Sequence, residues 1–139
     1  MDKLKIMIVD DSAVMRLIVS NMLRDDPHLD VLVRYAANGQ EALDKLGQFQ
    51  PDLILLDIEM PKMDGLEFLR HARLKSKAKV IVLSAVTPAG SKKAVQARSL
   101  GADAVIAKPS GTVSFDLEEK RGNELRQTIY QLLGIDNHK

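Results

Sequence analysis

Acidic, hydroxyl and basic residues stand at the ends of separate apolar runs in this chain. Asp10 and Asp11 follow a first apolar run, and Asp57 closes a run of four consecutive apolar residues. Ser84 and Lys108 follow two later runs. Most of these residues, taken singly, have an ordinary explanation as a helix cap, a turn residue or a solvated lysine. Asp57 is the exception, because a carboxylate that ends a fully apolar run must be solvated, paired or bound to a metal.

A shared position for these residues would make a phosphoryl-binding site. Three carboxylates in one crevice repel one another unless a cation compensates, and Mg²⁺ suits a small site with few carboxylates, remaining waters and a phosphate oxygen. The ammonium of Lys108 can bind a phosphoryl oxygen as a point charge, and the hydroxyl of Ser84 can donate to another. A carboxylate is a candidate nucleophile there, since aspartyl phosphate is an established covalent form.

The elements that would position these residues alternate along the chain. Five β-rich apolar runs cover Leu4 to Val9, Val31 to Ala36, Leu53 to Leu56, Val80 to Leu83 and Ala104 to Ala107. Helical periodicity extends over Ala13 to Arg24, about Gln40 to Gly47, Leu66 to Leu74, about Ser91 to Leu100 and roughly Leu117 to Leu133. This alternation predicts an α/β fold, a doubly wound five-stranded parallel sheet with helices on both faces. In such sheets the ligand site lies beyond the carboxyl ends of the strands.

The first predicted helix has Ser12 as its N-cap and one broad apolar face. At about 100° per residue this face collects Val14, Met15, Ile18, Val19, Met22 and Leu23. Leu17 falls off the face, beside Arg16. Leu17 is therefore a candidate contact with a partner protein, although a single exposed leucine is also common in proteins without such a role.

Composition indicates a globular protein and argues against a nucleic-acid-binding, secreted or membrane-spanning one. Hydrophobic residues make up 45% of the 139 residues, which is ordinary for a globular chain, and the net charge of +1 gives no global field toward nucleic acid or an anionic membrane. The absence of cysteine fits a reducing compartment. The apolar runs are too short to span a bilayer, and no signal peptide precedes the first strand. We expect one cytoplasmic domain over residues 1–139, with a core of about 3–133 and no effector domain.

With these residues in place, the chain resembles the receiver domain of two-component response regulators over about residues 3–133. The resemblance rests on Asp10-Asp11, Asp57, Met60-Pro61-Lys62-Met63-Asp64-Gly65, Ser84 and Lys108-Pro109. Within the family, the chain is most similar to the receiver of chemotaxis protein-glutamate methylesterases, through Asp-Ser-Ala after the acidic residues, Asp57-Ile58-Glu59-Met60-Pro61 and Lys108-Pro109-Ser110-Gly111. The resemblance implies a flavodoxin-like (βα)5 fold with strand order 2-1-3-4-5.

The resemblance also implies roles for the acidic residues. Asp57 would accept a phosphoryl group from a histidine kinase or a histidine phosphotransfer protein. Asp10, Asp11 and Asp57 would hold Mg²⁺ directly or through water, with Asp11 the more direct ligand and the backbone carbonyl of Glu59 a further one. Glu59 and Val86 occupy positions that the family varies to tune hydrolysis of the acyl phosphate.

Ser84 and Lys108 are implied to bind the oxygens of the acyl phosphate, and the bond between Lys108 and Pro109 is expected to be cis. The family usually has Tyr or Phe three residues before this lysine, whereas this chain has Val105. A valine cannot swing between a buried and an exposed rotamer in the same way. The readout is therefore expected through the loops around Ser84 and Lys108, or through the face of the fourth and fifth helices.

The expected role is that of a switched interaction surface rather than an enzyme, apart from its own phosphorylation and dephosphorylation. The chain contains no Gly-x-Ser-x-Gly motif for a methylesterase, so it is either a stand-alone receiver or a receiver without its effector domain. We expect a histidine donor and a downstream protein target as partners, no nucleic acid and no membrane, and a monomer or a phosphorylation-dependent dimer. Leu17 is the candidate contact with the donor.

Three alternative functions fit the residues less well. A Mg²⁺-dependent aspartyl-phosphate hydrolase of the haloacid dehalogenase type would place an Asp-x-Asp pair on the first strand, but this chain has adjacent acids there and the lone acceptor on the third. A nucleotide-binding domain would need a glycine-rich loop after the first strand. A receiver-like module that no longer accepts phosphate has no support, because every chemical position is filled. His28, His71 and His138 have no metal-ligand spacing.

Overall fold

The computed structural model describes residues 3–58, 63–84, 92–107 and 115–135; for residues 107 and 115–123 it describes the backbone alone. The strands are β1 Leu4–Val9, β2 Val31–Ala36, β3 Leu53–Asp57, β4 Lys79–Ser84 and β5 Ala104–Ala107. The helices are α1 Ala13–Arg24, α2 Gly39–Phe49, α3 Gly65–Ala72, α4 Lys92–Ser99 and α5 Phe115–Leu133. The predicted alternation of strands and helices is confirmed.

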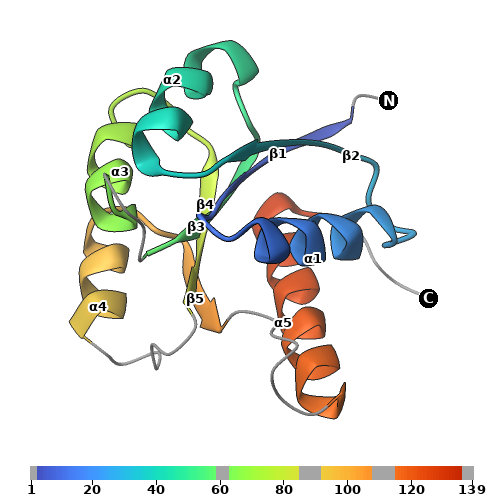
Figure 1. Cartoon of the computed structure of the whole chain (residues 1–139). Coiled ribbons are helices and arrows are strands. Elements are labelled where there is room, and N and C mark those ends of the chain that lie inside the picture. Colours follow the sequence, from blue (N-terminus) through green and yellow to red (C-terminus); the bar gives the residue numbers. More distant parts are fainter. Residues whose placement is uncertain (1–2, 59–62, 85–91, 108–114, 136–139) are drawn as a thin grey trace.

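The five strands form one parallel sheet in the order β2-β1-β3-β4-β5. Helices α1 and α5 lie on one side of the sheet, and α2, α3 and α4 lie on the other (Figure 1). The predicted doubly wound, flavodoxin-like fold is therefore confirmed. Because the chain order and the spatial order differ, β1 and β3 are neighbours at the centre, and the residues after them meet at one edge of the sheet.

Two apolar clusters, one on each side of the sheet, form the core. Along β3, Ile54 and Leu56 pack with the layer of α2, α3 and α4, whereas Leu53 and Leu55 pack with α1 and α5. Successive side chains of a strand point to opposite faces, so both parities of a central strand must be apolar when both faces are covered. This is why the run before Asp57 is uninterrupted.

Helix α1 differs in its rotation from the sequence prediction. Ser12 caps it as expected, with its Oγ accepting from the Met15 N–H at 3.2 Å. Val14, however, is 66% exposed, so its predicted place on the core face was wrong. The helix turns Val19, Leu23 and the polar Ser20 toward the sheet, because the hydroxyl of Tyr35 donates to Ser20 Oγ at 2.9 Å.

The exposure of Leu17 is confirmed, whereas the predicted end of the third helix at Leu74 was wrong. Leu17 is 58% exposed, as its off-face position predicted. Leu74, which was placed in the third helix, lies in the turn beyond α3 and is 84% exposed.

Among the helices that the structure describes, none combines the length and the apolar character of a membrane span.

A buried polar contact fixes α5 to the connection between α1 and β2. The hydroxyl of Tyr130 donates to Asp26 Oδ2, and the guanidinium Nε of Arg126 lies 3.7 Å from the same oxygen. Asp26 Oδ1 accepts from the His28 N–H at 2.8 Å. Burial, followed by the hydrogen bond to Asp26 and its charge, raises the pKa of Tyr130 from 10.0 to about 12.

This raised pKa predicts a loss of stability in alkali. Between pH 10 and about 12, folded Tyr130 keeps a proton that the unfolded chain releases, so the free energy of unfolding falls as the pH rises through this window. Tyr130→Phe removes this contribution. Urea denaturation across the window should show the wild type losing its advantage over the variant; two parallel curves would contradict the prediction.

Candidate functional site

The residues predicted to do chemistry gather at the carboxyl ends of the central strands. Asp57 is the last residue of β3 and only 5% exposed; Ser84 is the last residue of β4 and is buried. The register pairs Val9 with Leu56 and Asp57 with Leu83. Asp10, directly after Val9, therefore lies level with Asp57, and Ser84 lies one residue further along the next strand.

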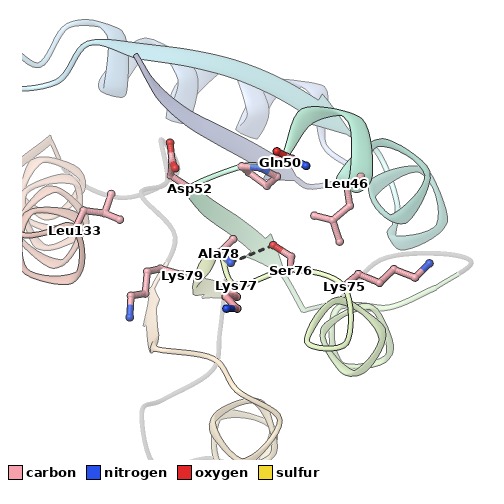
Figure 2. A pocket seen from close by; sticks show the side chains of 11 residues that line it. Leu46, Gln50, Asp52, Lys75, Ser76, Lys77, Ala78, Lys79 and Leu133 are labelled. Atoms are coloured by element: carbon pink, nitrogen blue, oxygen red, sulfur yellow. Dashed lines mark hydrogen bonds between the residues drawn. The ribbon is translucent and has the colours of Figure 1, made fainter. Parts of the chain in front are cut away.

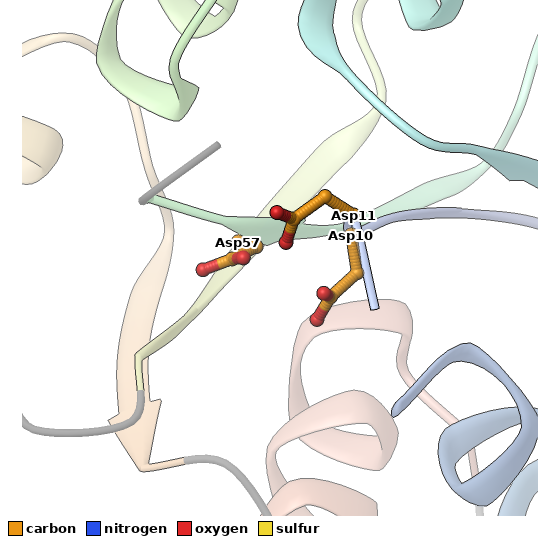
Figure 3. A group of neighbouring side chains, drawn as sticks. All are labelled: Asp10, Asp11 and Asp57. Atoms are coloured by element: carbon orange, nitrogen blue, oxygen red, sulfur yellow. The ribbon is translucent and has the colours of Figure 1, made fainter. Parts of the chain in front are cut away.

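Asp10, Asp11 and Asp57 form a carboxylate cluster. Each contributes an oxygen, and these three oxygens lie within 4.8 Å of one another. Asp10 and Asp57 are buried, while Asp11 is exposed. Figure 3 shows the Asp11 side chain extending toward Asp57 while the Asp10 side chain leaves the backbone in another direction. This agrees with the expectation that two successive residues at a strand end do not play equivalent parts.

The carboxylate cluster fits a hard divalent cation. Two buried carboxylates so close to a third require a compensating positive charge, and oxygen ligands favour Mg²⁺ or a similar ion. Asp10 Oδ1 already accepts from the Ser12 N–H at 2.9 Å. This leaves Asp11 as the member of the adjacent pair that is turned toward Asp57 and open to solvent.

Arg16 supports the cluster in a way that sequence reasoning missed. Its Nη1 donates to the backbone carbonyl of Asp10 at 2.7 Å. The bond ties the first turn of α1 to the end of β1 and brings a cation beside the acids. No sequence signal identifies this bond, because the same spacing would equally allow a solvated arginine.

Hydrogen bonds around the start of α2 fix the turn that follows β2. Asn38 Oδ1 accepts from the Glu41 N–H, and Glu41 Oε1 accepts from the Ala37 N–H, both at 2.9 Å. The hydrogen bond from Ala37, with Lys45 and Arg16 nearby, holds the pKa of Glu41 below its usual value despite partial desolvation. Gly39 donates to the Met63 carbonyl at 3.1 Å, which links this turn to the β3–α3 connection. The Asn-x-x-Glu spacing is a capping-box pattern that could have been predicted.

Gly65 sets the distance between α3 and the end of β3. Its N–H donates to the Ile58 carbonyl at 2.8 Å. A Cβ at this position would lie 2.4 Å from the Asp57 carbonyl oxygen and 2.7 Å from the Ile58 Cα. Only a glycine allows this approach, so the backbone of Asp57 depends on a residue that has no functional group.

Several predicted residues cannot be placed. Glu59, Val86, Lys108 and the Lys108–Pro109 bond lie outside the described residues. Val105, in β5, is buried and packs in the same core cluster as Ala94 and Ala97 of α4. The side chain at this position therefore belongs to the contact between the sheet and α4.

Comparisons with known proteins agree with this geometry. Residues 6–116 match the family model described as the response regulator receiver domain. A protein-glutamate methylesterase/protein-glutamine glutaminase of Oceanobacillus iheyensis is 42% identical over 129 residues, which cover 93% of this chain and 36% of that protein. Its counterpart in Halalkalibacterium halodurans is 44% identical over 119 residues, 86% of this chain and 34% of that protein. The chain spans about a third of the length of these relatives.

Solved structures give the same result. The response regulator domain of Thermotoga maritima CheB has a TM-score of 0.84 at 32% identity, covering 98% of this chain and 100% of that one. A structure described as the P1 domain of CheA3 in complex with CheY6 from R. sphaeroides has a TM-score of 0.77 at 52% identity, covering 96% of this chain and 99% of that one.

The close approach at Gly65 predicts a cost for any side chain there. Gly65→Ala should lower the free energy of unfolding by about 1–3 kcal/mol, because the new methyl meets backbone atoms that cannot move aside cheaply. Gly47→Ala in α2 is the matched control: its Cβ meets nothing within 4 Å, so this change should stabilise the helix by about 0.5–1 kcal/mol. Urea denaturation of both variants tests the difference, and equal effects would contradict it.

Proposed function

The chain belongs to the family of response regulator receiver domains, the phosphoacceptor signalling domains of two-component systems, and we propose that Asp57 is its phosphoacceptor. The observation that carries this proposal is the position of Asp57. It closes a fully buried strand, it is 5% exposed, and its carboxylate lies beside those of Asp10 and Asp11. Because the chain belongs to this family, we do not retain the alternative hypothesis of a haloacid dehalogenase-type hydrolase.

The proposed reaction is a transfer from a phosphohistidine. A carboxylate oxygen of Asp57 attacks the phosphorus, an O–P bond forms and the P–N bond breaks. The imidazole keeps the electron pair of the broken bond and takes up a proton. Mg²⁺ held by Asp10, Asp11 and Asp57, with the Glu59 carbonyl, would supply positive charge for the oxygens of the transferred group.

The remaining groups bind the product. The hydroxyl of Ser84, at the end of the strand next to β3, is proposed to donate to one oxygen of the acyl phosphate. Lys108 is proposed to pair with another. Phosphorylation adds about −1.5 to −2 of charge at pH 7, and these contacts would bias a two-state equilibrium of the surrounding loops. The output would then be a protein–protein contact.

The esterase activity named for the curated relatives belongs to proteins about two and a half times as long. We infer that this chain acts as the receiver alone or as the receiver of a longer regulator. Its lack of cysteine supports a place in the reducing cytoplasm. Its oligomeric state stays a prediction.

The donor is proposed to dock on α1. Leu17 and Val14 are 58% and 66% exposed and lie three residues apart, on one side of the helix that follows Asp10 and Asp11. The structure of CheY6 with the P1 domain of CheA3 supports a donor of that class for this chain, at 52% identity. An apolar strip beside the acceptor would hold the donor histidine near Asp57.

Labelling with acetyl phosphate tests the acceptor. Wild type with Mg²⁺ should take up one phosphoryl group per chain, and Asp57→Asn should take up none, because an amide is not a nucleophile in this step. Asp11→Asn should keep the acceptor but weaken Mg²⁺ binding about tenfold or more. Intact mass spectrometry and calorimetric Mg²⁺ titration measure the two effects. Labelling of Asp57→Asn at the wild-type level would rule the proposal out.

Leu17→Glu tests the docking surface. It should slow transfer from a phosphorylated P1-type donor about tenfold or more, through lost apolar burial and an added charge, and leave labelling by acetyl phosphate unchanged. Leu74→Glu is the control, since Leu74 is even more exposed but lies in the turn after α3, at the other edge of the sheet. Equal slowing by both variants, or loss in both assays, would exclude a docking role for Leu17.

A further inference from the structure

A groove of about 590 Å³ opens at the amino-terminal edge of the sheet, opposite the carboxylate cluster. It lies between the end of α2, the α3–β4 connection and the end of α5 (Figure 2). Its lining is partly apolar and partly basic, through Leu46, Pro51, Leu133, Lys75, Lys77 and Lys79. We call this feature the basic groove.

The basic groove belongs to the most positively charged part of the chain. Between positions 70 and 102 there is no aspartate or glutamate, although the whole chain carries a net charge of only +1. The same segment holds eight cationic residues, Arg70, Arg73, Lys75, Lys77, Lys79, Lys92, Lys93 and Arg98. Three of the eight line the groove, so positive charge is concentrated there.

These three lysines have no internal counter-ion in the part of the chain that the structure describes. No described carboxylate lies within salt-bridge distance of Lys75, Lys77 or Lys79. Asp52 also lines the groove, but its Oδ2 accepts from the Lys5 backbone N–H at 2.9 Å and so helps to join β1 to β3.

Helix dipoles explain only part of this charge. Lys75 lies in the turn that ends α3, where a cation complements the free carbonyl groups. Lys77 and Lys79 lie two and four residues further along, beyond the last turn in which this effect operates. Both are exposed, whereas Ala78 between them is buried. Their side chains therefore present charge outward from the rim of the groove.

We propose that the basic groove binds an acidic segment of a partner protein, whose carboxylates face Lys75, Lys77 and Lys79 and whose apolar side chains contact the half-buried Leu133. Figure 2 shows the ammonium groups of Lys75 and Lys79 pointing in different directions, which suits several carboxylates along a peptide rather than one small anion. The concave shape of the groove suits a peptide better than a flat lipid surface.

The site is independent of phosphorylation chemistry. Asp52 lines the groove and Asp57 belongs to the carboxylate cluster, and the five residues of β3 separate them by about 17 Å. A partner in the groove leaves the acceptor edge open, so a phosphodonor and this partner can bind at the same time. The inference does not rest on the proposed acceptor and is unaffected by Asp57→Asn.

The test is a two-dimensional ¹⁵N–¹H NMR titration with a synthetic peptide of glutamate and leucine, against a counterpart with lysine in place of glutamate. Amide shifts are expected at Gln50, Ser76, Ala78 and Leu133, and only with the acidic peptide. Lys77→Glu combined with Lys79→Glu should weaken binding about tenfold. Lys92→Glu combined with Lys93→Glu makes the same charge change on α4 and should leave binding within about twofold of wild type.

Comparison of the basic groove with the lysines of α4 separates specific binding from general attraction to positive charge. Shifts confined to the groove, lost in the first double variant and kept in the second, support the proposal. Shifts that spread equally over α4, equal weakening by both double variants, or no binding would overturn it. Binding to phosphatidylserine vesicles without binding to the acidic peptide would also overturn it and indicate a lipid surface. Thermal unfolding of both variants shows that they remain folded.

Discussion

Electrostatic repulsion among three carboxylates is the constraint on which this structure depends. Asp10 and Asp57 are buried at the ends of adjacent strands, and the three carboxyl oxygens lie within 4.8 Å of one another. Such an arrangement costs free energy unless a cation shares the space, because charge is poorly solvated beside an apolar core. In the function proposed above, a divalent ion with oxygen ligands would relieve this cost and would then attract phosphate.

The scaffold holds these acids in place through backbone contacts. The strand order puts β1 beside β3, and apolar side chains on both faces keep the two strands in register. Arg16 binds the Asp10 carbonyl, and the absent side chain of Gly65 lets α3 start against the Asp57 backbone. Residues outside the carboxylate cluster therefore set the positions of Asp10 and Asp57.

The carboxylate cluster and the basic groove lie at opposite edges of the sheet. Acids gather where the strands end, and lysines gather where β3 and β4 begin. Lys79 begins β4 four residues before the level of Asp57, so the backbones of the two sets are about 13 Å or more apart along the strands, which exceeds the screening length of about 8 Å at physiological ionic strength. A single small domain can therefore present two electrostatically separate surfaces to two partners. The net charge of +1 conceals this separation.

The sequence by itself determined the five strands, the Ser12 cap, the exposure of Leu17 and the location of Asp10, Asp11, Asp57 and Ser84 at the strand ends. These features depend on local periodicity and on apolar runs. Tertiary structure alone decided that Ser20 is buried and Val14 exposed, and that Tyr130 bonds to Asp26 across 104 positions. It also brought Lys77 and Leu133 to one groove. Such contacts follow from how each helix is rotated on the sheet, and periodicity does not determine this rotation when a polar residue such as Ser20 finds a buried partner.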